Sequence, residues 1–428
     1  MRKLAVAVLL AMVIAMPALA QRRRAATPLP VDATTVAGWL SLHARPLVSV
    51  EPYPWSYDLE PLGRMVGDAT IVGLGDGTHG THEFFTVKQR IIEYLAREKQ
   101  FDVIALEAPF SIFNRLNDWV QGGAGDPVAI LAEGEKIGYY FWYTEEILEL
   151  VRAMREYNLR RGSQPRLEIA GVDIYGYQSD AAAVVAYLRG IDPAAAVRAE
   201  SLYSCIGKQT TTCEGDVTRV HDQLAARRAE LVPLTSARAF DDAVRAARIV
   251  LQYFEGAAGT ARDASMAANT LWLQKHHSAS GKVMVWAHNE HLGRTKTANA
   301  RHPMGLQITT ALADPNDYFI IGTLAGGGSF LQYTHASANA PSQLSTQSFR
   351  AFAGDSYEAR FSEARVPQLL VPLDGELPAW LTTATSFRWA GSGPQDGTPD
   401  VVQKESLPEK FDAVVFVATT TPARMLPR

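Results

Sequence analysis

One stretch, residues 69–109, constrains the fold more than any other part of the sequence. An apolar run from Ala69 to Leu74 leads into a glycine-rich turn, residues 85–97 have helical spacing, and a second apolar run ends on Glu107. This order of strand, loop, helix and strand predicts a βαβ unit with parallel strands. Because ligands of open α/β sheets bind beyond the carboxyl ends of the strands, we expect the functional site at the polar end of this unit.

Four of the expected strands end on an acidic residue or a histidine. The strands are residues 69–74, 103–106, 167–172 and 282–287, and the polar residues at their ends are Asp76 with His79, Glu107, Asp173 and His288. In a parallel sheet these ends lie at one edge, so we expect the side chains to converge there. With further strands expected at 318–324, 368–372 and 413–417, we predict an α/β fold whose mainly parallel sheet is flanked by helices in three layers.

The predicted helix after the first strand has an apolar and a charged face. Val87 and Ile91 belong to the apolar face, whereas Lys88 and Arg90 are expected on the charged face. Residues 178–277 have helical periodicity almost throughout, and we predict that they form a helical insertion, or cap, over the strand ends. We assign residues 31–428 to one elaborated domain that includes this cap.

The first thirty residues differ from the rest of the chain. Arg2 and Lys3 precede an apolar run from 4 to 16, and Ala18-Leu19-Ala20 offers a cleavage site, so residues 1–20 are predicted to be a signal peptide. An uncleaved N-terminal anchor is the alternative. Residues 21–30, with three arginines, are expected to be a leader. We therefore expect an exported protein, periplasmic or secreted, with no membrane-spanning segment after cleavage.

Net charge and cysteine content bear on the expected binding partners and on a possible disulfide. The formal net charge is −4, and loss of two cations with residues 1–20 makes it −4 − 2 = −6, which favours neither nucleic acid nor an anionic membrane as a partner. The two cysteines, Cys205 and Cys213, flank a polar loop. In an exported protein such a pair is predicted to form a local disulfide, whereas two unpaired thiols are the alternative.

The glycine-rich turn formally matches the G-x-G-x-x-G dinucleotide pattern over residues 75–80. Asp76 would repel the phosphates, however, and Glu107 comes 27 residues after Gly80 rather than about 20. We therefore expect no nucleotide and no other cofactor. No Gly-x-Ser-x-Gly elbow occurs either, so the polar groups would have to act on water or on the substrate directly.

His79 is the central candidate because an imidazole in such a loop suits general-base catalysis near neutral pH. Asp76 could orient it, and Glu107 could add a second acid, base or positioning group. A loop-stabilising role for His79 is the alternative. His288 could have either a functional or a structural role, whereas His82 and His291 are expected to be structural on sequence alone.

A metal site is the competing interpretation of the same residues. His79 with His82, Glu107, and His288 with His291 supply enough donors for zinc or manganese. The HExxH helix motif is absent, and two histidines three residues apart in a glycine-rich loop share no fixed face.

Taken together, several blocks resemble the erythromycin esterase family, and the likeness covers nearly all of the chain after the leader. The blocks are residues 75–85, 105–108, 154–158, 171–176, 262–269, 286–291 and 411–423. Each is weak alone, but as a set they are specific, and they identify the chain as similar to an exported member of that family.

The resemblance implies a metal-independent hydrolase that opens a macrolide lactone by water attack, with antibiotic resistance as the associated role. It places the general base at His79, with Asp76, Glu107 and His288 as the other catalytic residues. It further implies substrate-binding roles for Lys88, Asp173, Arg262, Asp263 and His291, and an ester or lactone as the partner molecule.

Two positions depart from the family pattern. The family usually has glutamate where this chain has Asp76, and often arginine near the position of Lys88. A carboxylate one methylene shorter would hold water differently, and a misplacement of about 1 Å can lower a rate on the order of a hundredfold. The alternatives are therefore a metal-dependent hydrolase at the same edge, a non-catalytic periplasmic ligand-binding protein, or a polysaccharide-biosynthesis factor.

Overall fold

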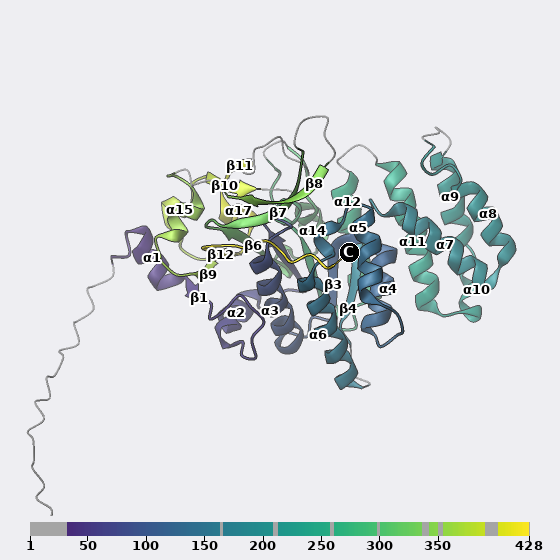
Figure 1. Ribbon diagram of the computed structural model, residues 1–428, viewed down its shortest axis with the longest axis horizontal. Helices are drawn as coiled ribbons and strands as arrows, with labels where there is room; N and C mark the ends of the chain where they lie inside the picture. The colour runs from purple at the N-terminus through teal and green to yellow at the C-terminus, as the bar shows by residue number, and fades with distance from the viewer. Residues whose placement is uncertain are drawn as a thin grey trace, which may run out of the picture.

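The computed structural model shows one large sheet with helices on both faces (Figure 1). The structure describes residues 32–162, 166–208, 213–256, 261–297, 300–335, 342–349, 354–389 and 401–427. The predicted signal peptide and leader lie outside these ranges. Within them, no helix combines the length and the apolarity needed to cross a membrane.

The central sheet has eight strands among the described residues. In spatial order they are β1 (Arg45–Pro46), β9 (Gln368–Pro372), β12 (Ala413–Val417), β6 (Tyr318–Ala325), β2 (Ile71–Asp76), β5 (Val283–His288), β3 (Val103–Pro109) and β4 (Glu168–Asp173). The pairs from β12 to β4 are all parallel, and only β9 runs antiparallel to its neighbours β12 and β1. The predicted mainly parallel α/β architecture is thus confirmed.

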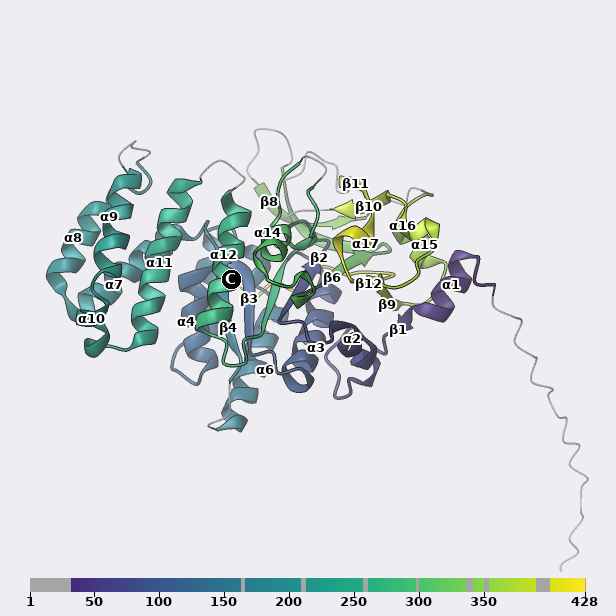
Figure 2. The same cartoon turned by 180° about the vertical axis from the view of Figure 1, so that it is seen from behind.

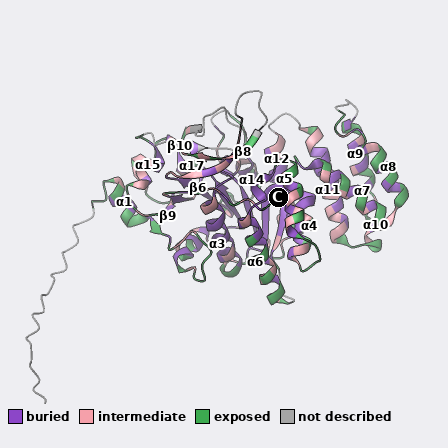
Figure 3. Cartoon of the chain, viewed as in Figure 1, coloured by how far each residue is buried: buried purple, intermediate pink, exposed green. Residues whose placement is uncertain are grey.

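Successive side chains along each strand point to opposite faces of the sheet, so a separate hydrophobic core lies on each face. Val72 and Leu74 of β2 pack in one core with α3 (His82–Glu98) and α6 (Glu145–Arg161), which lie in front of the sheet in Figure 1. Ile71 points to the other core, shared with α12 (Ala261–His276) and α14 (Met304–Ala311), which lie in front in Figure 2. Because both faces are covered, the central strands are buried along their whole length (Figure 3).

The remaining helices and strands lie outside the central sheet. Those in the N-terminal part of the chain are the helices α1 (Val36–His43), η1 (Tyr57–Leu59), α2 (Glu60–Val66), α4 (Phe110–Val120), α5 (Pro127–Lys136) and η2 (Tyr140–Trp142). Toward the C-terminus come α13 (Asn289–Leu292), η4 (Pro315–Asp317), α15 (Tyr357–Ser362), α16 (Ala379–Thr382) and α17 (Leu407–Lys410), with the paired strands β7 (Ser329–His335) and β8 (Ser342–Ser348), and β10 (Thr385–Trp389) and β11 (Val401–Glu405).

Helix α3 departs from the expected amphipathic pattern. Its predicted apolar face is buried, but Lys88 and Arg90, expected on the charged face, are buried as well. Lys88 contacts Asp76, and Arg90 forms an ion pair with Asp58 at 2.8 Å. The prediction for these two cations is wrong because each one has a buried carboxylate partner, which periodicity along one helix does not show.

The described part of the segment from 178 to 277 is mainly helical, as its periodicity indicates. It forms α7 (Tyr177–Ile191), α8 (Pro193–Tyr203), α9 (Cys213–Ala225), α10 (Arg228–Leu231), η3 (Val232–Leu234), α11 (Ala237–Glu255) and α12. Helices α7 to α11 occupy the end of the molecule opposite α1 (Figures 1 and 2), whereas α12 packs on the sheet and starts close to the strand ends. The separate cap domain stays a prediction.

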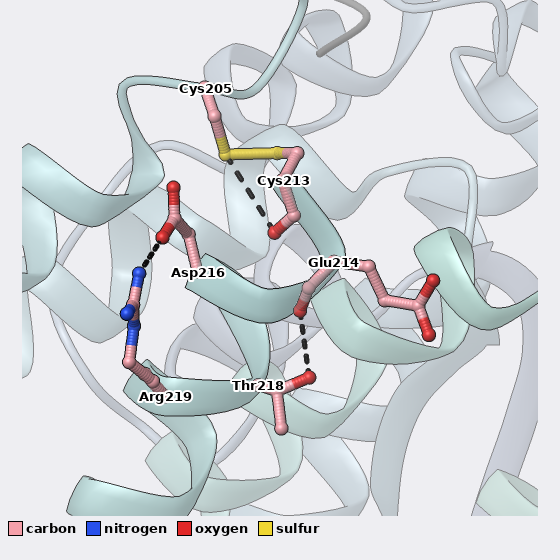
Figure 4. The surroundings of a disulfide bond; sticks show 6 residues. All are labelled: Cys205, Cys213, Glu214, Asp216, Thr218 and Arg219. Carbon is pink, nitrogen blue, oxygen red and sulfur yellow. Dashed lines mark hydrogen bonds and ion pairs between the residues drawn. A yellow bond between two sulfur atoms is a disulfide. The ribbon is translucent and has the colours of Figure 1, made fainter. Parts of the chain in front are cut away.

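The two cysteines form the predicted disulfide. Cys205 and Cys213 are joined by an S–S bond of 2.08 Å with their Cα atoms 5.4 Å apart, which links the end of α8 to the start of α9 (Figure 4). Both side chains are buried among helices α7 to α11, which we call the helical bundle.

Replacing both cysteines by serine should lower the free energy of unfolding by roughly 2 to 3 kcal/mol, because the unfolded chain has more conformational entropy when no disulfide closes this loop. Urea denaturation followed by circular dichroism measures the change. A reducing agent should lower the stability of the wild type similarly and leave the double variant unaffected. An unchanged unfolding midpoint after removal of the bond would contradict this expectation.

Candidate functional site

The polar ends of β2, β5, β3 and β4 lie on four adjacent strands. Asp76 is the register partner of His288 across the β2–β5 ladder. Glu107 lies in β3 on the far side of β5, where the β3–β4 pairing is irregular between Leu106 and Pro109. Asp173 ends β4. All four side chains are buried, so the expectation that these strand ends meet at one edge of the sheet is confirmed.

The glycines of the loop after β2 allow close backbone packing. The carbonyl of Gly80 accepts hydrogen bonds from the backbone N–H of Leu331 and of Ala423, both at 2.9 Å. A Cβ atom on Gly80 would lie 2.0 Å from the carbonyl oxygen of Leu331. One on Gly75 would lie 2.2 Å from Oδ1 of Asn289. The loop is therefore held by protein backbone and side chains.

His79 lies between two carboxylates. Its Nδ1 is 2.7 Å from Oδ2 of Asp76, and its Nε2 is 3.8 Å from Oε2 of Glu107. The ring stacks on Phe141 with centroids 4.4 Å apart and is 4 % exposed. The carboxylate at Nδ1 favours the tautomer protonated there, which leaves the lone pair of Nε2 on the Glu107 side.

Asp76 is held as a buried carboxylate by three neighbours. Nζ of Lys88 and Nε1 of Trp286, the latter at 2.9 Å, both donate to Oδ1. Burial opposes ionisation of Asp76, but Lys88 and then His79 outweigh it and lower its pKa. Burial in turn lowers the pKa of Lys88 to about 8, although Asp76 opposes that shift. Near neutral pH the pair is therefore ionic.

Arg262, near the start of α12, links the acids of β3 and β4. Its Nη2 donates to Oε1 of Glu107 at 2.7 Å, and its Nε donates to Oδ1 of Asp173 at 3.0 Å. Its Nη1 lies 3.0 Å from Nε2 of His291, and its guanidinium lies 4.7 Å from the ring centroid of Tyr175. This cation fixes two acids that come from different strands.

His291 adds a second positive group to this cluster. Its Nδ1 lies 2.7 Å from Oδ1 of Asp263, which also accepts the backbone N–H of Met304 at 2.9 Å. Burial lowers the pKa of His291, but Glu107 and Asp263 outweigh burial and raise it to about 10. Burial likewise opposes ionisation of Glu107, whereas His291, Arg262 and His79 lower its pKa well below the ordinary value.

His288 stays neutral and faces the loop. Its Nδ1 accepts the backbone N–H of Glu290 at 3.3 Å, so Nε2 carries the ring proton and donates to the carbonyl of Gly77 at 3.3 Å. Burial, followed by the neighbouring His79, lowers the pKa of His288 to about 3. The imidazole rings of His288 and His79 are 5.2 Å apart between centroids.

The structure thus brings all nine predicted site residues into one connected cluster. They are Asp76, His79, Lys88, Glu107, Asp173, Arg262, Asp263, His288 and His291. Within it, Lys88 is 1 % exposed and points at Asp76. Its ammonium is therefore placed to act through Asp76.

His82 lies outside this cluster. Its Nδ1 is 2.6 Å from Glu146 and its Nε2 is 2.9 Å from Glu51. The neighbouring Glu83 accepts two hydrogen bonds from Thr421. His82 therefore links α3 to α6, and the pair His79 and His82 does not converge. Across the part of the chain that the structure describes, no three His, Cys, Asp or Glu side chains are arranged to hold a metal ion.

Sequence reasoning missed the aromatic residues around the cluster. Phe141 stacks on His79, Trp142 donates from Nε1 to the carbonyl of Glu107 at 3.0 Å, and Trp286 donates to Asp76. Tyr139 is buried beside them. The run of aromatic residues from 139 to 143 was a visible signal, but no chemistry could be assigned to it without its position.

Comparisons with known proteins identify the same family that the sequence motifs resemble. Residues 96–420 match the sequence model of the erythromycin esterase family. This match begins after β2 and its loop. The chain is also 23 % identical over 316 residues to the erythromycin esterase type II of Escherichia coli, which covers 63 % of this chain and 72 % of that protein.

Solved structures show the same fold. A crystal structure of a Bacillus cereus protein superposes with a TM-score of 0.78 at 23 % identity and covers 93 % of this chain and 100 % of that one. The structure of an erythromycin esterase mutant, EreC in its open conformation, superposes with a TM-score of 0.67 at 20 % identity, covering 89 % of this chain and 98 % of that one.

The pKa of Lys88 can be measured directly by NMR on isotope-labelled lysine side chains. We expect one lysine to titrate at a pH of about 8, and Lys88→Met should remove that signal and leave the others. Because 8 lies below the ordinary value of 10.5, the unfolded chain binds more protons than the folded chain between these pH values. This group therefore makes the protein more stable as the pH rises through that window.

The control is the rest of the lysine spectrum, which should be unchanged in the Lys88→Met variant. Titration of every lysine at or above the ordinary value would contradict the expectation that burial of Lys88 outweighs the attraction of Asp76.

Proposed function

Because the chain belongs to the erythromycin esterase family, a family of hydrolases, we propose that it hydrolyses an ester or lactone by general-base activation of water. The observation that carries this proposal is the position of His79 between the carboxylates of Asp76 and Glu107. An imidazole with a carboxylate at one ring nitrogen and a lone pair at the other is suited to take a proton from water.

The proposed first step forms one bond and moves one proton. The water oxygen attacks the substrate carbonyl carbon while Nε2 of His79 takes a water proton. The imidazolium that forms is stabilised by Asp76 at Nδ1, and Lys88 keeps Asp76 ionised. In the second step the tetrahedral intermediate collapses, the bond to the leaving alkoxide breaks, and the proton on His79 passes to that oxygen. No covalent bond to the protein is required.

Glu107 and Arg262 have supporting roles in this scheme. Glu107 lies on the Nε2 side of His79 and can accept a hydrogen bond from the attacking water. Arg262 and His291 hold Glu107 in place, and their positive charge offsets the negative charge that develops on the carbonyl oxygen. His288, neutral and donating to Gly77, positions the loop that carries His79.

The substrate class is also a proposal. A macrolide-type lactone follows from what the relatives are called, erythromycin esterases. Asp76, in place of the usual glutamate, keeps the carboxylate close to Lys88 and Trp286, so it serves His79 and does not itself have to reach water. We further propose that the protein works outside the cytoplasm, which the signal-like N-terminus and the disulfide support.

Replacing His79 with alanine should lower kcat/KM by about 10² to 10⁴, the usual contribution of a general base. The assay follows hydrolysis of p-nitrophenyl acetate, a simple δ-lactone and erythromycin. His221→Ala is the matched control, because His221 lies on α9 beside Asp222 in the helical bundle. The control should keep full activity. Retention of activity by a folded His79→Ala variant would exclude His79 as the base.

Removal of metal ions separates this proposal from the metal-dependent alternative. After dialysis against a chelator and elemental analysis, hydrolysis of the same esters should continue at the original rate, because His79 and Glu107 are engaged with protein groups. Loss of activity that zinc or manganese restores would favour a metal-dependent hydrolase. Tight binding of an ester without turnover would favour a non-catalytic binding protein.

A further inference from the structure

Strand β2 separates from its neighbour β6 just before the loop that carries His79. The register pairs of β2 and β6 end at Leu74 and Ile321, whereas β2 continues beside β5 as far as Asp76. The next residue but one on β6 is Thr323, which is only 1 % exposed. Because buried peptide groups need hydrogen-bond partners, the backbone on both sides of this separation has to be paired in another way.

The side chain of Asn289 lies between the two strands at this point. Its Oδ1 accepts the backbone N–H of Thr323 at 3.2 Å, and its Nδ2 donates to the carbonyl of the same residue at 2.8 Å. Gly75 leaves room for this amide, since a Cβ atom there would lie 2.2 Å from Oδ1 of Asn289. The amide thus pairs with β6 where the ladder with β2 has ended.

The hydroxyl of Thr323 pairs in turn with the backbone of β2 and of the loop. Its Oγ1 donates to the carbonyl of Gly75 at 3.0 Å and accepts the backbone N–H of Gly77 at 3.2 Å. The carbonyl of Gly77 accepts the ring N–H of His288 at 3.3 Å. One hydroxyl therefore holds the backbone on both sides of Asp76.

The directions of two catalytic side chains depend on this stretch of backbone. Asp76 lies between the two glycines that Thr323 contacts, and His79 follows two residues after Gly77. Nδ1 of His79 is 2.7 Å from Oδ2 of Asp76, a contact that a shift of either residue would change. A misplacement of about 1 Å at a reacting group can lower a rate on the order of a hundredfold.

We propose that Thr323 is a positioning residue whose hydroxyl sets the path of the loop and, through it, the geometry of Asp76 and His79. Thr323 acts through the backbone of Gly75 and Gly77 and does not contact the substrate. This inference rests on the proposed hydrolytic function and deepens it.

Thr385 provides a matched control in another part of the structure. It also lies on a strand, β10, and is 3 % exposed. Its hydroxyl likewise donates to a backbone carbonyl, that of Thr383 at 2.9 Å, and accepts a hydrogen bond from Nη1 of Arg360 at 3.3 Å. The two threonines therefore share burial and the kinds of hydrogen bond, but the partners of Thr385 lie outside residues 75–79.

The kinetic test compares Thr323→Val with Thr385→Val, each of which replaces a hydroxyl by a methyl group. For the hydrolysis of p-nitrophenyl acetate and of a simple δ-lactone, Thr323→Val should lower kcat by about ten- to a hundredfold with little change in KM. Thr385→Val should stay within about twofold of the wild type, since the geometry of the site is unchanged. Wild-type kcat in a folded Thr323→Val variant would overturn the inference.

The conservative variant Thr323→Ser shows whether the hydroxyl is responsible. It keeps the donor and acceptor and should retain most of the wild-type kcat. A Thr323→Ser variant as slow as Thr323→Val would overturn the inference. If Thr323→Val does not fold, Thr323→Cys takes its place, because sulfur is a weaker donor and acceptor and should give a lower kcat than Thr323→Ser. Equal kcat in those two variants would then overturn the inference.

The indole N–H of Trp286 gives a readout that does not depend on activity. It donates to Oδ1 of Asp76 at 2.9 Å, so its NMR resonance, assigned with Trp286→Phe, reports the position of that carboxylate. Thr323→Val should move this resonance, whereas Thr323→Ser and Thr385→Val should leave it in place. An unchanged resonance in folded Thr323→Val would overturn the inference, whatever its kcat.

The failure of this inference can be told apart from failure of the proposed function. A wild-type protein that hydrolyses the esters while Thr323→Val matches it in kcat excludes the role of Thr323 alone. A wild-type protein that hydrolyses none of them excludes the hydrolytic function, and the Trp286 resonance then still decides whether Thr323 holds Asp76 in place.

Discussion

The buried ion pair between Lys88 and Asp76 is the interaction on which the site depends. Transferring both charges from water into the interior costs several kcal/mol per ion. The pair persists because Trp286 and His79 also contact the carboxylate. Asp76 ends β2, which lies between β5 and β6 in the sheet. The orientation of His79 is thus tied to a strand that is paired on both sides in the central sheet, and the shorter aspartate side chain suits a carboxylate that binds a lysine on the adjacent helix.

A second set of charges balances the opposite side of His79. Glu107, Asp173 and Asp263 are buried acids, and Arg262 and His291 are the cations that contact them. These groups come from β3, β4, the start of α12 and α13, so four separate elements are joined by charge-assisted contacts. Dipoles and charges fixed in this way need no rearrangement when a reaction creates new charge, which is the main electrostatic advantage of an enclosed site.

The sequence predicted the sheet and the convergence of the strand ends because buried parallel strands are apolar runs and their carboxyl ends share an edge. It could not predict the environment of Lys88. Helical periodicity placed that residue on a charged face, and only the tertiary fold shows Asp76 opposite it. Phe141 and Tyr139 were missed for a related reason, because a single 3-10 turn has no repeat that reveals its orientation. Cys205 and Cys213 were correctly paired since few residues separate them.

The hydrogen bonds to the Gly80 carbonyl have a consequence for the order of assembly during synthesis. Ala423 and Gly80 are about 340 residues apart, and β2 pairs only with strands that come more than two hundred residues later. Synthesis must therefore have passed residue 423 before the loop bearing His79 can take its final shape. Such distant pairings are slow to form, so the loop bearing His79 is expected to reach its final conformation late in folding, after most of the local helices have formed.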